Sequence, residues 1–270
     1  MLFRQRMPLP RSLVLVALLA PACADPPPEP VARRVDLRAA GLTAPHVAGV
    51  AIEPDGARLV LDDAAGLYRL APDGTATLVR ALAALPTPDV PVRPPFTDVV
   101  ALGDGRFALT AIGDGYLLDL GADTMRQYFC YEPGGFPEDE EQRTTAVAYD
   151  PVAARLYAQP RTFDAAGALL RSEVAAYAAD TGADVAWRSL PDDLDAGGMI
   201  ADADGLLLGA GSRLYRYDLG TYTLTAADDL ARFGVGRIAG LGLDGAAQRL
   251  VVVDGARAEL VELDLATLDR

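Results

Sequence analysis

Hydrophobic and polar residues alternate in short runs along most of the chain, and tight-turn sequences separate the runs. Residues 66–79 give the pattern: GLYRL, a Pro-Asp-Gly turn, and a second alternating run. This arrangement predicts a β-hairpin. It recurs four more times, at residues 115–129, 172–187, 212–225 and 258–270.

A second hairpin pattern precedes each copy, with Asp-Gly or Asp-Pro at its turn in most cases. These preceding hairpins span residues 49–63, 99–110, 146–159, 198–210 and 240–254. The unit therefore has four strands, occurs five times, and returns about every 40 to 60 residues, which is typical of a β-propeller. We expect an all-β fold with very little helix.

The last copy ends just after its third strand. Residues 32–41 are predicted to supply the missing outer strand and so to close a ring of five four-stranded blades. A sixth, degenerate blade in the Pro-rich residues 81–96 is the alternative. The propeller is expected to form one domain over residues 35–270.

Two repeats carry a resemblance to a known group. "YDPVAARLYAQ" (149–159) and "LYRYDLGTYTLT" (214–225) resemble the repeats of the broad YVTN/NHL-like propellers, in which a D-P-x-x-x-x-L-Y strand leads to an h-x-h-D-x-x-T turn. The resemblance implies the propeller repeat and leaves the activity open.

The first 22 residues are predicted to be a secretory signal peptide. A basic segment with Arg4, Arg6 and Arg11 precedes an apolar run at residues 13–20, which is too short to span a bilayer. The protein is therefore expected outside the cytoplasm of a bacterium.

The sequence around Cys23 allows two cleavage sites. Ala-Pro-Ala-Cys resembles the bacterial lipobox, which would place a lipid on Cys23 and anchor the protein to the cell envelope; ordinary cleavage after Ala24 would leave it free in the periplasm. The lipoprotein reading is favoured, because the Pro-rich residues 23–34 suit a tether. The lipid anchor would then be the protein's only contact with the membrane.

Composition excludes several chemistries. The net charge of −14 disfavours nucleic acid as a partner. The chain has no Lys, no Asn and one His, so a Schiff-base lysine and a multi-histidine metal site are ruled out. Once Cys23 is modified or removed, Cys130 has no partner for an intrachain disulfide.

A functional site is expected at one rim of the propeller. Three long irregular connections, at residues 81–96, 131–143 and 160–173, are predicted to project from the same rim. The five expected innermost strands can be aligned on one central hydrophobic residue each: Val50, Val100, Val147, Met199 and Leu241. The residue four positions earlier is expected at the channel mouth, which gives His46, Phe96, Arg143, Asp195 and Arg237. Asp98 lies two positions after Phe96, further into the channel. These six residues are predicted to surround the channel mouth and to bind a small polar or anionic ligand, with Arg143 and Arg237 as fork donors. Solvated loop ends are the alternative.

Other motifs give weaker indications. His46 with Asp98 or Asp195 could form an acid–base pair, with Cys130 as a thiol nucleophile, but a loop histidine and a buried cysteine fit as well. The acidic run at residues 138–141 and the Asp202–Asp204 turn could hold calcium, although a solvated loop and a plain hairpin turn explain them. No metal site and no cofactor are expected.

Two functions are compatible with these features. The favoured one is a monomeric, non-enzymatic binding or scaffold propeller that recognises a protein or an envelope component on its loop-bearing rim. The alternative is a metal-dependent propeller hydrolase or lactonase with a divalent ion at the channel, for which the chain offers no recognisable set of ligands.

Overall fold

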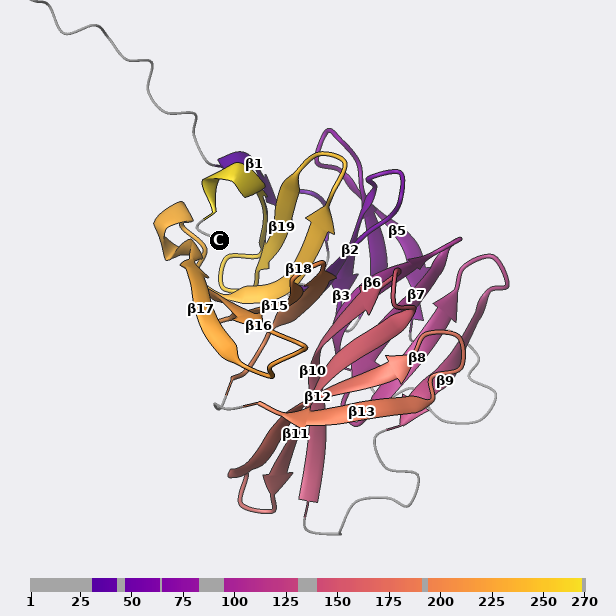
Figure 1. The fold of residues 1–270 in the computed structure, drawn as a ribbon. Helices are drawn as coiled ribbons and strands as arrows, with labels where there is room; N and C mark the ends of the chain where they lie inside the picture. The colour runs from indigo at the N-terminus through magenta and orange to yellow at the C-terminus, as the bar shows by residue number, and fades with distance from the viewer. Residues whose placement is uncertain are drawn as a thin grey trace, which may run out of the picture.

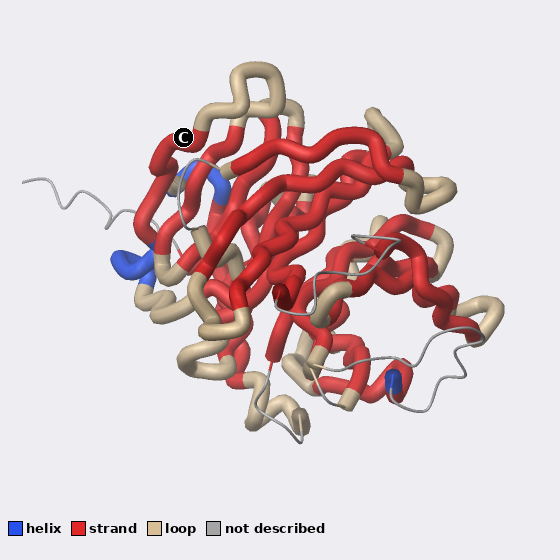
Figure 2. The backbone as a smooth tube through the Cα atoms, turned by 90° about the horizontal axis from the view of Figure 1, so that it is seen from below, coloured by secondary structure: helices blue, strands red, loops and turns tan. Residues whose placement is uncertain are grey.

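A computed structural model of the chain describes residues 31–42, 47–63, 65–82, 95–130, 140–190 and 194–268. Strands make up nearly all of the regular structure (Figure 2). They form five four-stranded antiparallel sheets, which are the blades of a β-propeller (Figure 1). The prediction of an all-β, five-bladed propeller is confirmed.

Four blades are built from consecutive strands. Blade 1 contains β2 (Val47–Ile52), β3 (Arg58–Asp62), β4 (Gly66–Leu70) and β5 (Ala76–Ala81). Blade 2 contains β6 (Phe96–Gly103), β7 (Arg106–Ala111), β8 (Asp114–Asp119) and β9 (Thr124–Cys130). Blade 3 contains β10 (Glu140–Asp150), β11 (Arg155–Asp164), β12 (Leu169–Ala178) and β13 (Asp184–Ser189). Blade 4 contains β14 (Gly198–Asp202), β15 (Gly205–Ala210), β16 (Arg213–Tyr217) and β17 (Leu224–Asp229).

Blade 5 combines both ends of the described chain. Its inner strands are β18 (Ile238–Asp244), β19 (Arg249–Asp254) and β20 (Glu259–Asp264), and its outer strand is β1 (Val31–Asp36), which pairs antiparallel with β20. The predicted closing strand is thus confirmed. The innermost strands β2, β6, β10, β14 and β18 contact one another in this order, and β18 contacts β2, so the ring is complete with five blades.

A buried charge cluster stabilises the closure. Glu262 on β20 is fully buried and accepts from three arginines that come from three different strands. The distances are 3.5 Å to Arg33 of β1, 3.1 Å to Arg58 of β3 and 2.8 Å to Arg249 of β19. Because Arg58 belongs to blade 1, these ion pairs join the first blade to the last. Breaking such a buried pair is costly.

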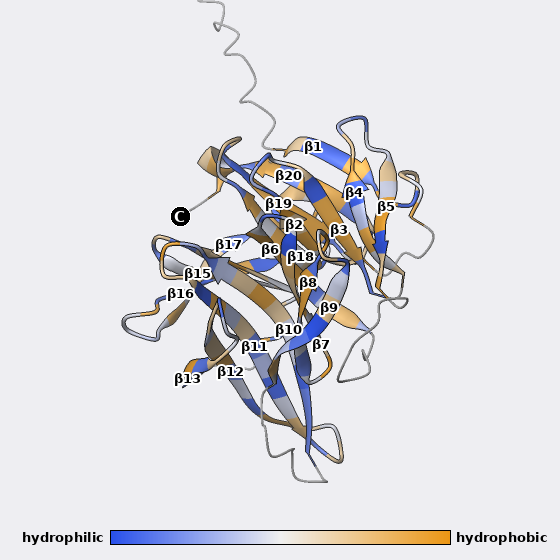
Figure 3. Cartoon of the chain, turned by 90° about the vertical axis from the view of Figure 1, so that its right-hand side faces the viewer, coloured by the Kyte–Doolittle hydropathy of each residue, from blue (hydrophilic) through white to orange (hydrophobic). Residues whose placement is uncertain are grey.

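The hydrophobic core lies between neighbouring blades (Figure 3). In the wedge between blades 1 and 2, for example, Leu59 and Leu67 pack against Phe107, Leu118 and Met125. Every second side chain of a strand points into one such wedge, which explains the alternation in the sequence.

Blade 3 differs from the others in its length. Strands β10, β11 and β12 extend beyond the rim as a three-stranded arm (Figure 1), with Glu140 paired to Asp164 and Phe163 paired to Leu169. The expectation that residues 160–173 form an irregular connection is therefore wrong, because these residues continue two strands and a short turn. Of the other two predicted connections, residues 83–94 and 131–139 lie outside the described residues.

Helical structure in the described part is limited to short 3-10 turns, among them η2 (Leu230–Phe233) and η3 (Leu265–Thr267). Within the described ranges, no helix has the length and apolar character needed to cross a membrane.

Candidate functional site

A cavity of about 380 Å³ opens at the mouth of the central channel. Four of the five innermost strands have a register irregularity at this level, close to the first residue in β2, β6 and β18 and after Thr144 in the longer β10. Strand β14 begins just after the corresponding position. The residues at this position line the cavity: Ala48, Thr97, Thr145, Gly197 and Ala239. Bulges redirect side chains at the rims of sheets, and here they leave small residues and two hydroxyl groups around the opening.

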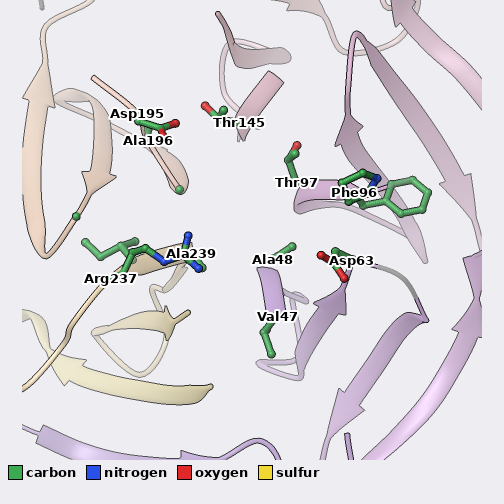
Figure 4. A pocket seen from close by; sticks show the side chains of 14 residues that line it. Val47, Ala48, Asp63, Phe96, Thr97, Thr145, Asp195, Ala196, Arg237 and Ala239 are labelled. Atoms are coloured by element: carbon green, nitrogen blue, oxygen red, sulfur yellow. The ribbon is translucent and has the colours of Figure 1, made fainter. Parts of the chain in front are cut away.

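Three charged residues surround this ring, namely Asp63, Asp195 and Arg237 (Figure 4). The main chain of Arg237 is fixed by hydrogen bonds, because its N–H donates to Asp254 Oδ1 at 3.1 Å and its carbonyl accepts from Gly255 N at 2.8 Å. Within the described part of the chain, its guanidinium forms no ion pair. The cavity therefore offers one arginine fork beside two carboxylates and two hydroxyl groups.

The arm of blade 3 stands at the edge of the cavity. Arg161 of β11, which is only 9% exposed, forms an ion pair of 3.0 Å with the cavity residue Asp195. The same face of the arm carries Phe163, whose ring is in contact with two guanidinium groups. Cζ of Arg143 is 4.9 Å and Cζ of Arg161 is 5.1 Å from the ring centroid. Cation–π contacts of this kind order both partners.

Arg143 is held on this face by its neighbour Glu141. Its Nε donates to Glu141 Oε1 at 2.8 Å and its Nη2 to Oε2 at 3.1 Å. The hydrogen bond from Arg143 lowers the pKa of the Glu141 carboxyl, and the same bond raises the pKa of Arg143. Both groups are therefore charged at neutral pH, and both are exposed to solvent.

Asp98 lies beneath the ring of small residues and does not itself line the cavity. The corresponding positions of the other innermost strands are Gly49, Ala146, Gly198 and Gly240. The three glycines leave no room for a side chain: a Cβ on Gly49 would lie 2.5 Å from Asp98 Oδ1, one on Gly198 2.5 Å from Leu241 N, and one on Gly240 2.6 Å from Gly49 Cα. At this level of the channel, Asp98 is therefore the one side chain larger than a methyl group.

Asp98 is completely buried and links three blades. Its Oδ1 accepts from Val99 N at 2.9 Å and its Oδ2 from Val147 N of blade 3 at 3.0 Å. Burial raises the pKa of this carboxyl well above its usual range, although the amides of Val147, Val99 and Met199 oppose the shift. Asp98 therefore has a structural position, and a ligand in the cavity does not reach it without rearrangement.

The structure separates the six predicted rim residues. Asp195 and Arg237 line the cavity, and Arg143 lies on the arm above it. The backbone of Phe96 borders the cavity, but its buried ring points away and packs edge-on against Tyr116 at 6.1 Å (Figure 4). His46 lies outside the described residues.

The predicted alignment is displaced by one residue in blade 2. Val99, and not Val100, occupies the position of Val50, and β6 has a second register irregularity, between Ala101 and Gly103, that the other innermost strands lack. Thr97 therefore reaches the opening, and Asp98 is moved beneath it. The sequence reasoning also missed Asp63, Arg161 and Phe163; the alternation of Arg161 and Phe163 was the available signal for the last two.

The two motifs considered for calcium have other roles in the described residues. Glu140 forms an ion pair with Arg171 at 3.3 Å and Glu141 with Arg143, while residues 138 and 139 lie outside the described part. Asp202 accepts from Asp204 N at 2.9 Å within a hairpin turn and pairs with Arg216. In the ranges that the structure describes, no three His, Cys, Asp or Glu side chains are grouped so that they could hold a metal ion.

Comparison with known proteins shows the fold. No family model matches the chain, and no curated protein matches its sequence. A chain of the crystal structure of a nidogen/laminin complex is similar with a TM-score of 0.51 and 16% identity, over 82% of this chain and 76% of that one. A calcium-binding protein, regucalcin, from Agrobacterium tumefaciens is similar with a TM-score of 0.50 and 13% identity, over 87% of this chain and 94% of that one. At this identity, the likeness establishes the propeller architecture alone.

Proposed function

We propose that this protein is a non-enzymatic binding propeller, which recognises a protein or an envelope component on the rim that carries the channel mouth and the arm. In this proposal the Pro-rich segment and a lipid on Cys23 hold it as a monomer at the outside of a bacterial membrane. The observation that carries the proposal is the arm, whose arginine–phenylalanine face adjoins the cavity.

The chemistry of the arm suits recognition of a partner. Aromatic and arginine side chains dominate the energetics of protein interfaces, because they combine a large contact area with directional hydrogen bonds. Here both Arg143 and Arg161 contact the ring of Phe163, and Arg161 also pairs with Asp195. Little side-chain entropy would be lost on binding, which favours affinity.

The cavity suits a polar group of the same partner. Arg237 offers donors for an anionic or carbonyl group, and Asp63 and Asp195 accept hydrogen bonds. The hydroxyl groups of Thr97 and Thr145 can both donate and accept hydrogen bonds. A polar side chain or sugar projecting from the partner would find complementary groups here.

The experiment compares two arginine–aromatic pairs on opposite rims. Phe163→Ala removes the aromatic centre of the arm. Tyr222→Ala is the matched control, because Arg188 covers Tyr222 at 4.8 Å and Tyr222 lies in the turn between β16 and β17, at the other rim. Envelope extracts are treated with each protein and a cross-linker, and the captured components are identified by mass spectrometry.

We expect components that are captured by the wild type and by Tyr222→Ala to be lost with Phe163→Ala. Purified components should then bind the wild type directly, and Arg143→Glu should weaken this binding. An identical set of captured components for all three proteins would refute recognition by the arm.

A further inference from the structure

A second cavity, of about 460 Å³, lies in the wedge between blades 4 and 5. Its volume falls in the range of small-molecule sites. It contains residues of the turns between β14 and β15 and between β18 and β19, so it opens toward the rim opposite the arm. No aromatic residue lines it, and its large apolar side chains are all aliphatic: Ile200, Leu207, Leu214, Leu243, Leu265 and Leu268.

The cavity exists because one large side chain is missing. The strand pairings place the pairs Phe107–Leu118 of blade 2, Leu156–Tyr177 of blade 3, Leu206–Tyr217 of blade 4 and Leu250–Leu263 of blade 5 at the same position. In blades 2 to 4 one residue of the pair is aromatic, and its ring packs in the wedge between that blade and the preceding one. In blade 5 both residues are leucines, so the pair supplies no ring to the wedge between blades 4 and 5.

The closure of the ring contributes to the same cavity. Blade 5 has no turn after β20, because its outer strand β1 comes from the other end of the described chain. The chain instead continues into η3, where Leu265 and Leu268 are half-buried and form one wall. This wall follows from the closure of the ring, because the other blades continue at this point into a turn and an outer strand of their own.

The opening of the cavity carries a neutral ion pair. Nη1 of Arg216 donates to both carboxylate oxygens of Asp202, at 2.6 and 2.7 Å, and about a quarter of each side chain is exposed. A carboxylate ligand would have to displace Asp202 from Arg216 and would also meet the carboxyl group of Asp204, which lines the cavity too. An ammonium ligand would compete with Arg216 for Asp202. A hydroxyl group can donate to Asp202 and accept from Arg216 while the pair stays intact.

We propose that this wedge binds a single-chain amphiphile with an uncharged, hydroxyl-bearing head, such as a monoacylglycerol. The aliphatic walls take up the acyl chain, and the Asp202–Arg216 pair binds the head at the opening. The site is separate from the arm, so its existence does not depend on the function proposed above.

The probe is monocaprylin, kept below its micelle concentration and compared with octanoate, which has the same chain and a charged head. Calorimetry gives the affinity, and thermal unfolding followed by circular dichroism gives Tm. At a concentration about 100-fold above Kd, monocaprylin should raise Tm by about 5–10 °C, because it binds the native state only. Octanoate should bind at least about tenfold more weakly, since its charge competes with the ion pair.

Variants separate the site from unspecific binding. Ala227→Phe places a ring in the cavity and should abolish binding, and Leu268→Ser should weaken it about tenfold by removing part of the apolar wall. Arg216→Met should weaken binding, while Arg69→Met should leave it unchanged. Arg69 is the control because it occupies in blade 1 the position that Arg216 occupies in blade 4, and it pairs with Glu53 as Arg216 pairs with Asp202. The wedge between blades 1 and 2 contains the large side chains of Phe107, Leu118 and Met125.

Three results would overturn the proposal. The first is the absence of binding to the wild type by both methods. The second is binding to folded Ala227→Phe and to Leu268→Ser with the wild-type affinity. The third is a concentration-dependent dimer of the wild type that Ala227→Phe abolishes, because the cavity would then be a contact between two copies.

Discussion

Replacing Asp98 at the centre of the propeller tests how a fully buried carboxyl group affects the stability of the fold. The carboxyl is fully buried, and Val99 N and Val147 N donate to its two oxygens. In Asp98→Asn, one of these oxygens becomes an NH₂ group that faces an amide N–H. Two buried donors then lack an acceptor, at about 1–3 kcal/mol each, so we expect a loss of about 2–6 kcal/mol at low pH.

The loss should become smaller as the pH rises. Burial raises the pKa of Asp98 above its value in the unfolded chain, so between these two pKa values the native state binds more protons than the unfolded state. The contribution of Asp98 to the free energy of unfolding therefore falls with pH, by up to about 1.4 kcal/mol per unit, from about pH 4 upward. Asp98→Asn has no carboxyl at this position and lacks this contribution.

Urea unfolding between pH 4.5 and pH 8 measures the effect, with the emission of Trp187, the single tryptophan, as the signal. Trp187 is well placed because it packs edge-on against Tyr177 at 6.2 Å, between blades 2 and 3. Asp98→Ala is the control: its absolute cost can differ, but its pH profile should match that of Asp98→Asn. A wild-type-minus-variant difference that is constant or grows with pH would refute the reasoning, because the amides would then outweigh burial.

Three further predictions concern closure, backbone and metal. Glu262→Gln should cost about 3 kcal/mol in urea unfolding, because the partly buried arginines around it lose their shared counter-charge; a loss below about 1 kcal/mol would contradict the role of the cluster. Gly66→Ala should lower Tm much more than Gly167→Ala, since both have positive φ but only a Cβ at Gly66 would overlap a backbone carbonyl, that of Arg80; equal shifts would contradict this. Millimolar calcium or manganese should leave Tm unchanged relative to EDTA, and a rise of several degrees would favour the metal-dependent hydrolase.

The architecture was predictable because its signals are local. Each blade consists of two hairpins, and a few consecutive residues are enough to show the alternating pattern and the turn of each hairpin. A single blade cannot cover its own apolar faces, so the blades are expected to pack side by side in a closed ring. The closing strand β1 was predictable for the same reason, since the unpaired β20 requires a partner.

The site was less predictable because it depends on bulges and on a proline. A bulge adds a residue without a partner, and β6 has an irregularity between Ala101 and Gly103 that the other innermost strands lack. Aligning Val100 with Val50 therefore placed Phe96 and Asp98 one step away from their true positions. Pro160 lies within β11, opposite Thr144, although proline rarely occurs inside a sheet. It concealed the strand that carries Arg161 and Phe163.

The location of Asp98 could not be derived from its own strand. Its burial results from small residues on four other strands, which meet it only after the ring has closed. The same holds for the ion pair between Arg161 and Asp195, which joins β11 to the segment before β14.

The pairing of β1 with β20 has a consequence for the connectivity of the chain. Val31 lies opposite Leu263, so the two ends of the described fold meet on adjacent strands of one sheet. A short linker between them would turn blade 5 into an ordinary meander, and a cut in any exposed hairpin turn could then create new termini. The order of the blades along the gene is therefore one of several circular permutations that would encode the same ring.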